Sequence, residues 1–187
     1  MKKNIKKLTY AGVLIALGAL LPQAFHIFGG MAGRIFLPIQ IPVLLAGAIL
    51  GGVYGGIIGV VVPVLSFVLS GMPPVPMVWF MVVELGVYGF VMGILSKKCN
   101  IYIALLISMV LGRVAYAIAL GTGVVLLGME EPFMTQGAFL TGIVTGLPGI
   151  AIQIAVIPIV YKRLKDGGFL FDDKVRRSKK DTGRTKG

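Results

Sequence analysis

Six apolar segments, separated by short polar, proline-rich or glycine-rich connections, constrain the fold of this chain more than any other feature. They cover approximately residues 8–28, 38–51, 51–69, 77–95, 101–127 and 136–161. An α-helix rises about 1.5 Å per residue, so about 20 apolar residues cross the roughly 30 Å hydrocarbon core of a bilayer. With 57% hydrophobic residues among 187, the sequence predicts an all-α integral membrane protein, a compact bundle of six transmembrane helices. Segments 38–51 and 51–69 are short, and we expect these helices to be tilted or to cross only in part.

The first apolar segment is long enough to span a membrane and lacks a small-x-small cleavage site. It therefore predicts a retained helix rather than a cleaved signal peptide. Residues 1–165 are predicted to form one transmembrane domain, and the polar, basic residues 166–187 a disordered cytoplasmic tail. The single cysteine, Cys99, excludes an internal disulfide.

Lysine and arginine are distributed unevenly around the six segments. They precede the first segment, lie between the fourth and fifth as Lys97 and Lys98, and follow the sixth; the exceptions are Arg34 and Arg113. Because basic residues are retained on the cytoplasmic side of a membrane, this asymmetry predicts that both termini are cytoplasmic. The net charge of +11 does not indicate a nucleic-acid partner, since the basic residues lack the interleaved aromatic residues of a nucleic-acid surface.

Two ionisable residues, Glu84 and Arg113, interrupt the fourth and fifth apolar segments. If these helices run antiparallel, each residue lies about 10–12 Å below the same membrane face, at about 1.5 Å rise per residue. A charge in hydrocarbon is unfavourable and usually marks a cavity, a partner or a substrate. Two interpretations are open: a ligand-binding role, or a structural ion pair within the bundle.

Further polar residues fall in the outer half of the predicted bundle, which suggests a pocket open to the outside. Tyr88 follows Glu84 at i+4, and Tyr116 follows Arg113 at i+3, so each pair shares a helix face. The remaining candidates for substrate binding are Gln23 and His26 near the outer end of the first helix, Arg34 in the outer loop, Gln40 at the outer end of the second helix, and Thr145 in the sixth. Gln153 lies deeper and is not among the candidates.

Motifs of enzymatic chemistry are not found in the sequence. It contains no P-loop, no HExxH, no cysteine–histidine metal spacing and no G-x-S-x-G. We therefore expect neither catalysis nor a bound cofactor or metal. Long inverted repeats with interrupted helices do not stand out either, which weakens the case for a self-contained secondary transporter.

Small residues recur at four-residue spacing in two places. Gly47, Gly51, Gly55 and Gly59 form one series, which we interpret as internal helix packing. Gly12 and Ala16 form a small-xxx-small face on the first helix, and for these residues docking of a partner helix is the open alternative.

Residues 6–165 resemble the substrate-binding S components of energy-coupling factor (ECF) vitamin transporters. The resemblance rests on six compact spans, basic termini, the opening LTYAGVLIAL at 8–17, and IPVLLAG at 41–47 leading to GGVYGGIIG at 51–59. It implies a subunit in the plasma membrane of a prokaryote that works with a transmembrane T component and two cytoplasmic ATPases. The family's AxxxA docking face would correspond to Gly12 and Ala16, with glycine replacing one alanine, and its gating loop to residues 28–37.

The leading hypothesis from the sequence is capture of a small water-soluble vitamin or precursor from outside for ATP-driven uptake. Arg113 would anchor a carboxylate, phosphate or carbonyl of the substrate. Glu84 would hold Arg113 in place or accept a hydrogen bond from a hydroxyl or amine of the substrate. An anionic or hydroxyl-rich ligand fits slightly better than a purely aromatic one. The alternatives are a self-contained secondary transporter or channel, and a ligand-free membrane assembly subunit.

Overall fold

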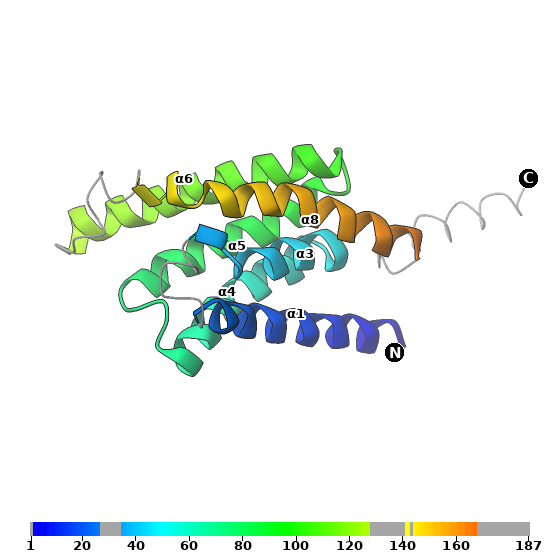
Figure 1. Ribbon diagram of the computed structural model, residues 1–187, viewed down its shortest axis with the longest axis horizontal. Helices are drawn as coiled ribbons and strands as arrows, with labels where there is room; N and C mark the ends of the chain where they lie inside the picture. Colours follow the sequence, from blue (N-terminus) through cyan, green and yellow to red (C-terminus); the bar gives the residue numbers. More distant parts are fainter. Residues whose placement is uncertain (1, 27–34, 128–140, 143, 168–187) are drawn as a thin grey trace, which may run out of the picture.

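The computed structural model describes residues 2–26, 35–127, 141–142 and 144–167, and over these residues the chain is helical with no strand (Figure 1). Its helices are α1 (Lys2–His26), α3 (Gln40–Leu50), α4 (Gly52–Ser70), α5 (Met77–Leu95), α6 (Ile101–Leu127) and α8 (Leu147–Asp166).

Five of these helices are long and apolar enough to cross a membrane. The predicted bounds of α5 and α6 agree with the structure, because a proline-rich segment and the Lys97–Lys98 turn delimit them sharply. The first helix begins earlier than expected, within the N-terminal lysines, and the last continues to Asp166 rather than ending at Tyr161.

Much of the outer surface of α1, α4, α6 and α8 is apolar and exposed, as expected of helices that face lipid. The chain is therefore a membrane protein, and a sixth complete crossing stays a prediction.

The short helix α3 lies at the centre of the bundle. It packs against α1, α4, α5 and α8, and every residue in it except Ile41 is buried. A helix that is apolar on all sides is stable only when neighbours cover all of it. With 11 residues, α3 is about 16 Å long at about 1.5 Å per residue, roughly half of a bilayer core. The expectation that this segment crosses only in part agrees with that length.

Glycines allow α3 and α4 to approach the backbone of α5. A Cβ atom added at Gly47 or at Gly55 would collide with the backbone oxygen of Gly89, and one at Gly59 would collide with Leu85 O. Such direct backbone contact is typical of helix packing in membranes, where small residues take the place of a hydrophobic driving force. The interpretation of this glycine series as internal packing is confirmed for Gly47, Gly55 and Gly59.

The N-terminal end of α1, the connection between α5 and α6, and the C-terminal end of α8 lie at one end of the bundle (Figure 1). We call this the basic end, because Lys97, Lys98, Lys162, Arg163 and Lys165 are found there. That it faces the cytoplasm stays a prediction. The predicted tail falls almost entirely on residues 168–187, outside the described part of the chain.

Candidate functional site

Glu84 and Arg113 form an ion pair between the neighbouring helices α5 and α6. Arg113 Nη1 lies 3.2 Å from Glu84 Oε1, and the two side chains are 3% and 23% exposed, Glu84 being the more buried. The expectation that they lie at the same depth is confirmed by this contact. Because a guanidinium has five N–H donors, an arginine that is still partly exposed retains donors for a further acceptor.

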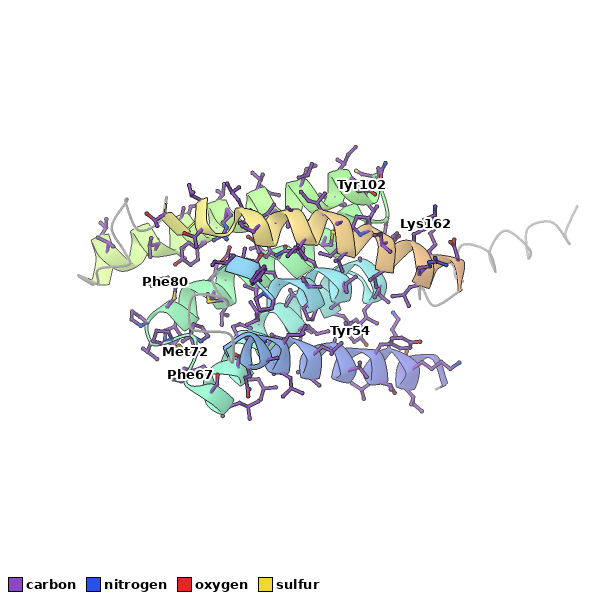
Figure 2. The ribbon with its side chains drawn as sticks, viewed as in Figure 1. Tyr54, Phe67, Met72, Phe80, Tyr102 and Lys162 are labelled. Carbon is purple, nitrogen blue, oxygen red and sulfur yellow. The ribbon has the colours of Figure 1, made fainter. Side chains whose placement is uncertain are left out.

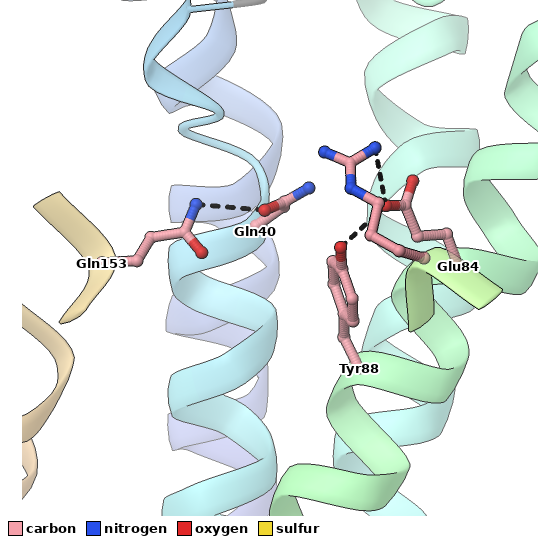
Figure 3. Close-up of polar contacts among 5 residues, drawn as sticks. Gln40, Glu84, Tyr88 and Gln153 are labelled. Carbon is pink, nitrogen blue, oxygen red and sulfur yellow. Dashed lines mark hydrogen bonds and ion pairs between the residues drawn. The ribbon is translucent and has the colours of Figure 1, made fainter. Parts of the chain in front are cut away.

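Tyr88 completes a three-residue cluster. Its hydroxyl donates a hydrogen bond of 2.8 Å to Glu84 Oε1, so this one carboxylate oxygen meets both the tyrosine and the arginine (Figure 3). The tyrosine ring is fully buried, and Gly112 on α6 provides the space for it, because a Cβ atom there would overlap the ring. Gly112 is a functional position that was not predicted, although a glycine directly before an arginine in an apolar helix is a visible signal.

Two glutamines form a second polar contact beside this cluster. Gln153 Nε2 on α8 donates to Gln40 Oε1 at the first residue of α3, with an N–O distance of 3.0 Å. Figure 3 shows Gln40 between Gln153 on one side and Tyr88 and Glu84 on the other. Gln153 is fully buried, and its Oε1 atom accepts no hydrogen bond from the described residues.

Gln40 is the first residue of α3, as the prediction that it lies at the outer end of the second helix requires, but its contact with Gln153 corrects the expectation that Gln153 lies deeper. The reason is the length of α3, which is too short to reach the outer face from the basic end, where it ends. Gln40 therefore lies well inside the bundle, level with Gln153. The signal for Gln153 in the sequence is its amide in an otherwise apolar stretch of α8.

The other predicted site residues are less closely associated with the cluster. Tyr116 is buried one helical turn beyond Arg113, with its ring edge against Phe80 at a centroid distance of 6.3 Å. Thr145 is half-buried. Gln23 donates back to Ala19 O of its own helix at 3.3 Å.

Two of the predicted candidates fall in or beside the outer loop. Arg34 and most of the expected gating loop, 28–34, lie outside the described residues, as does the side chain of His26. Their roles stay predictions.

The small face of α1 points away from the bundle. Gly12 and Ala16 are exposed, and a Cβ atom at Gly12 would meet no atom within 4 Å. On the same helix, Ala11, Leu14 and Ala19 are buried against the core. The residues predicted to dock a partner are therefore on an accessible surface.

The arrangement is suited to recognition by hydrogen bonds and charge. Within the described part of the chain, no group of three histidine, cysteine, aspartate or glutamate side chains could hold a metal ion. What the cluster offers is a partly exposed guanidinium beside a buried amide pair.

Residues 6–161, most of the chain, match the family described as the ECF transporter, substrate-specific component. This chain is an ECF substrate-specific component. No curated protein and no solved structure matches it. The membership makes this S component a substrate-binding subunit of a transporter and not an enzyme.

Proposed function

We propose that this S component captures a small water-soluble vitamin, or a precursor of one, and delivers it to a T component driven by two cytoplasmic ATPases. The observation that carries the proposal is Arg113, a membrane-embedded guanidinium that remains 23% exposed although it is paired with Glu84. A purely structural ion pair would be expected to be buried on both sides, because charge in hydrocarbon is unfavourable.

Arg113 provides the anchor for the substrate in this proposal. Its planar fork of donors matches a carboxylate or a polarised carbonyl, and the contact to Glu84 keeps the fork oriented. Tyr88 fixes Glu84 in turn through its hydroxyl. Glu84 and Tyr88 therefore act as positioning residues, while Arg113 contacts the substrate.

The two glutamines add a neutral subsite. Gln153 Oε1 is a buried acceptor that the described residues leave unsatisfied, so an N–H or O–H group of a substrate would complete it. A carboxylic acid that also carries an amide or hydroxyl group matches both sites: its carboxylate would pair with the Arg113 guanidinium, and its N–H or O–H group would donate to the Gln153 amide oxygen. We also propose, from the sequence, that Tyr116, Thr145, Gln23, His26 and Arg34 take part in substrate binding.

The identity of the substrate is tested by mass spectrometry of small molecules that co-purify with the detergent-solubilised protein. The candidate found there is then titrated against wild type and Arg113→Ala. Loss of a charged hydrogen bond of about 1.5–3 kcal/mol predicts roughly 10- to 150-fold weaker binding. Arg163→Ala, an exposed arginine at the basic end of α8, is the matched control and should bind as wild type. Unchanged affinity in Arg113→Ala would remove this residue from the site.

A further inference from the structure

A cavity opens at the basic end of the bundle, separate from the Glu84–Arg113 cluster. It has a volume of about 370 Å³, which is within the range of small-ligand sites. Three segments line it: the end of α5, the start of α6 and one face of α8. The residues involved are Ser96, Cys99, Asn100, Ile101, Tyr102, Pro158, Tyr161, Lys162 and Lys165. Ser96 is 12 residues from Glu84 on α5, or about 18 Å at about 1.5 Å per residue.

The charge around this cavity has one sign. Lys162 and Lys165 lie on the α8 face that also carries Pro158 and Tyr161, since these positions follow the i, i+3, i+4, i+7 pattern. Among the described residues no carboxylate lines the cavity, and Asp166 at the end of α8 is not part of its wall. Figure 2 shows Lys162 and Tyr102 at the same end of neighbouring helices.

The N-terminus of α6 adds to the positive potential. In the cavity wall, Ile101 and Tyr102 begin a 27-residue helix and Asn100 directly precedes it, and the free N–H groups and dipole at a helix N-terminus favour an anion. Asn100 Oδ1 accepts from Tyr102 N at 3.3 Å and satisfies one of these donors.

Ser96 supplies an independent indication of a ligand. Its Oγ atom is buried and has no hydrogen-bond partner among the described residues, while the residue as a whole is only 9% exposed. Buried hydroxyl groups are normally paired, so an unpaired one on a residue that lines the cavity indicates a missing acceptor, which the hydroxyl would reach by rotating toward the cavity. A phosphoryl oxygen held by the two lysines would meet this need.

We propose that this cavity binds the phosphate group of an anionic phospholipid. Large apolar side chains are exposed next to it on both lining helices, Ile103 and Leu106 on α6 and Ile159 on α8, where they would contact acyl chains. Lysines at the end of apolar helices attract anionic headgroups, and tyrosine is enriched at this level of the membrane. The site is independent of the substrate proposed above.

Cys99 makes occupancy directly measurable, because it is the chain's single cysteine, is exposed and lines the cavity. The full-length protein is reconstituted in nanodiscs of phosphatidylcholine alone or with phosphatidylglycerol, and the rate of alkylation by a neutral maleimide is measured. Phosphatidylglycerol should slow alkylation several-fold. Inorganic phosphate added to phosphatidylcholine nanodiscs distinguishes a free anion from a lipid headgroup.

The variant Lys162→Ala/Lys165→Ala should lose this protection, whereas Lys98→Ala/Arg163→Ala, with the same change in charge outside the cavity, should keep it. A Cys99→Ser/Lys98→Cys variant reports any general effect of surface potential on thiol reactivity and should show no comparable slowing. Native mass spectrometry of the two double-alanine variants should show retained phosphatidylglycerol only in the second.

Protection by inorganic phosphate alone would overturn the lipid assignment and leave a soluble phosphate site. Equal alkylation rates in both lipids, or protection that survives Lys162→Ala/Lys165→Ala, would overturn the site itself.

Discussion

At the scale of single residues, the polar centre of this protein depends on how each buried group is paired. Glu84 Oε1 receives a hydrogen bond from Tyr88 and lies against the guanidinium of Arg113. Gln153 pairs with Gln40 through its nitrogen and leaves its oxygen unsatisfied among the described residues. The first contact stabilises a charge, and the second offers an acceptor, so the two should respond differently to substitution.

Removing one partner of the ion pair should cost more stability than removing both. Glu84→Ala leaves a largely buried guanidinium unpaired and is expected to lower stability by about 3 kcal/mol, whereas Glu84→Ala/Arg113→Met removes both charges and should recover most of that loss. Thermal unfolding in detergent measures both variants. Substrate binding should remain weak in the double variant, since Arg113 is absent. A double variant less stable than Glu84→Ala would contradict this account.

The amide pair is predicted to contribute to binding more than to stability. Gln40→Leu/Gln153→Leu removes two buried amides together, so no partner is left unsatisfied, and the melting temperature should stay the same or rise. Substrate affinity should fall about tenfold, equivalent to about 1.4 kcal/mol of lost hydrogen bonding. Calorimetric titration and a thermal scan on one preparation measure both effects. If the double variant binds substrate with full affinity, the amide pair has only a structural role.

At the scale of helices, α3 determines the depth of the site and α5 determines how closely the bundle packs. An 11-residue helix begins inside the bundle, and this brings Gln40 to the level of Gln153. The backbone of α5 is in direct contact with α3 and α4 at Gly89. Substitution at this contact should therefore be poorly tolerated.

Gly89 and Gly86 provide a matched test of this packing on one helix. A Cβ atom at Gly89 would collide with the backbone of Gly55, which cannot move aside, whereas one at Gly86 would meet Val60 Cγ2 at an ordinary 3.5 Å. Gly89→Ala should therefore lose about 1–3 kcal/mol of stability, and Gly86→Ala should be neutral or slightly stabilising, because alanine favours a helix. The unfolding temperatures of the two variants measure this difference in stability. Equal temperatures would show that α5 packs less closely than described.

At the scale of the whole molecule, different surfaces serve the roles proposed here. The polar cluster lies within the bundle, the basic cavity lies at one end, and Gly12 and Ala16 are exposed along α1. Docking of a T component on α1 should therefore be separable from substrate binding.

Gly12→Trp should abolish uptake in cells that also contain the T component and ATPases, because a bulky side chain keeps a partner helix away. The isolated variant should bind substrate with wild-type affinity. Gly121→Trp is the matched control, since Gly121 on α6 is also an exposed glycine with no atom within 4 Å of an added Cβ. It should transport normally. Accumulation of substrate in vesicles that contain wild-type S component alone would instead support a secondary transporter.

From the sequence it was possible to predict the class of protein, the bounds of α5 and α6, and the common depth of Glu84 and Arg113, whereas their ion pair was one of two open interpretations until the structure showed it. These features depend on local quantities: the length and hydrophobicity of a segment, the residues that end a helix, and the rise per residue that converts position into depth. The ECF membership agrees with the resemblance that the sequence showed.

The tertiary structure alone decided which faces of the helices meet. It brought Gln153 to Gln40, accommodated the Tyr88 ring over Gly112, and left Gly12 and Ala16 exposed while Ala11 was buried. In a helix that is apolar on nearly every side, hydrophobic periodicity does not distinguish the lipid-facing surface from the buried one. Rotation and depth are then set by contacts between segments distant in sequence, such as the glycine contacts that position α3 within the bundle.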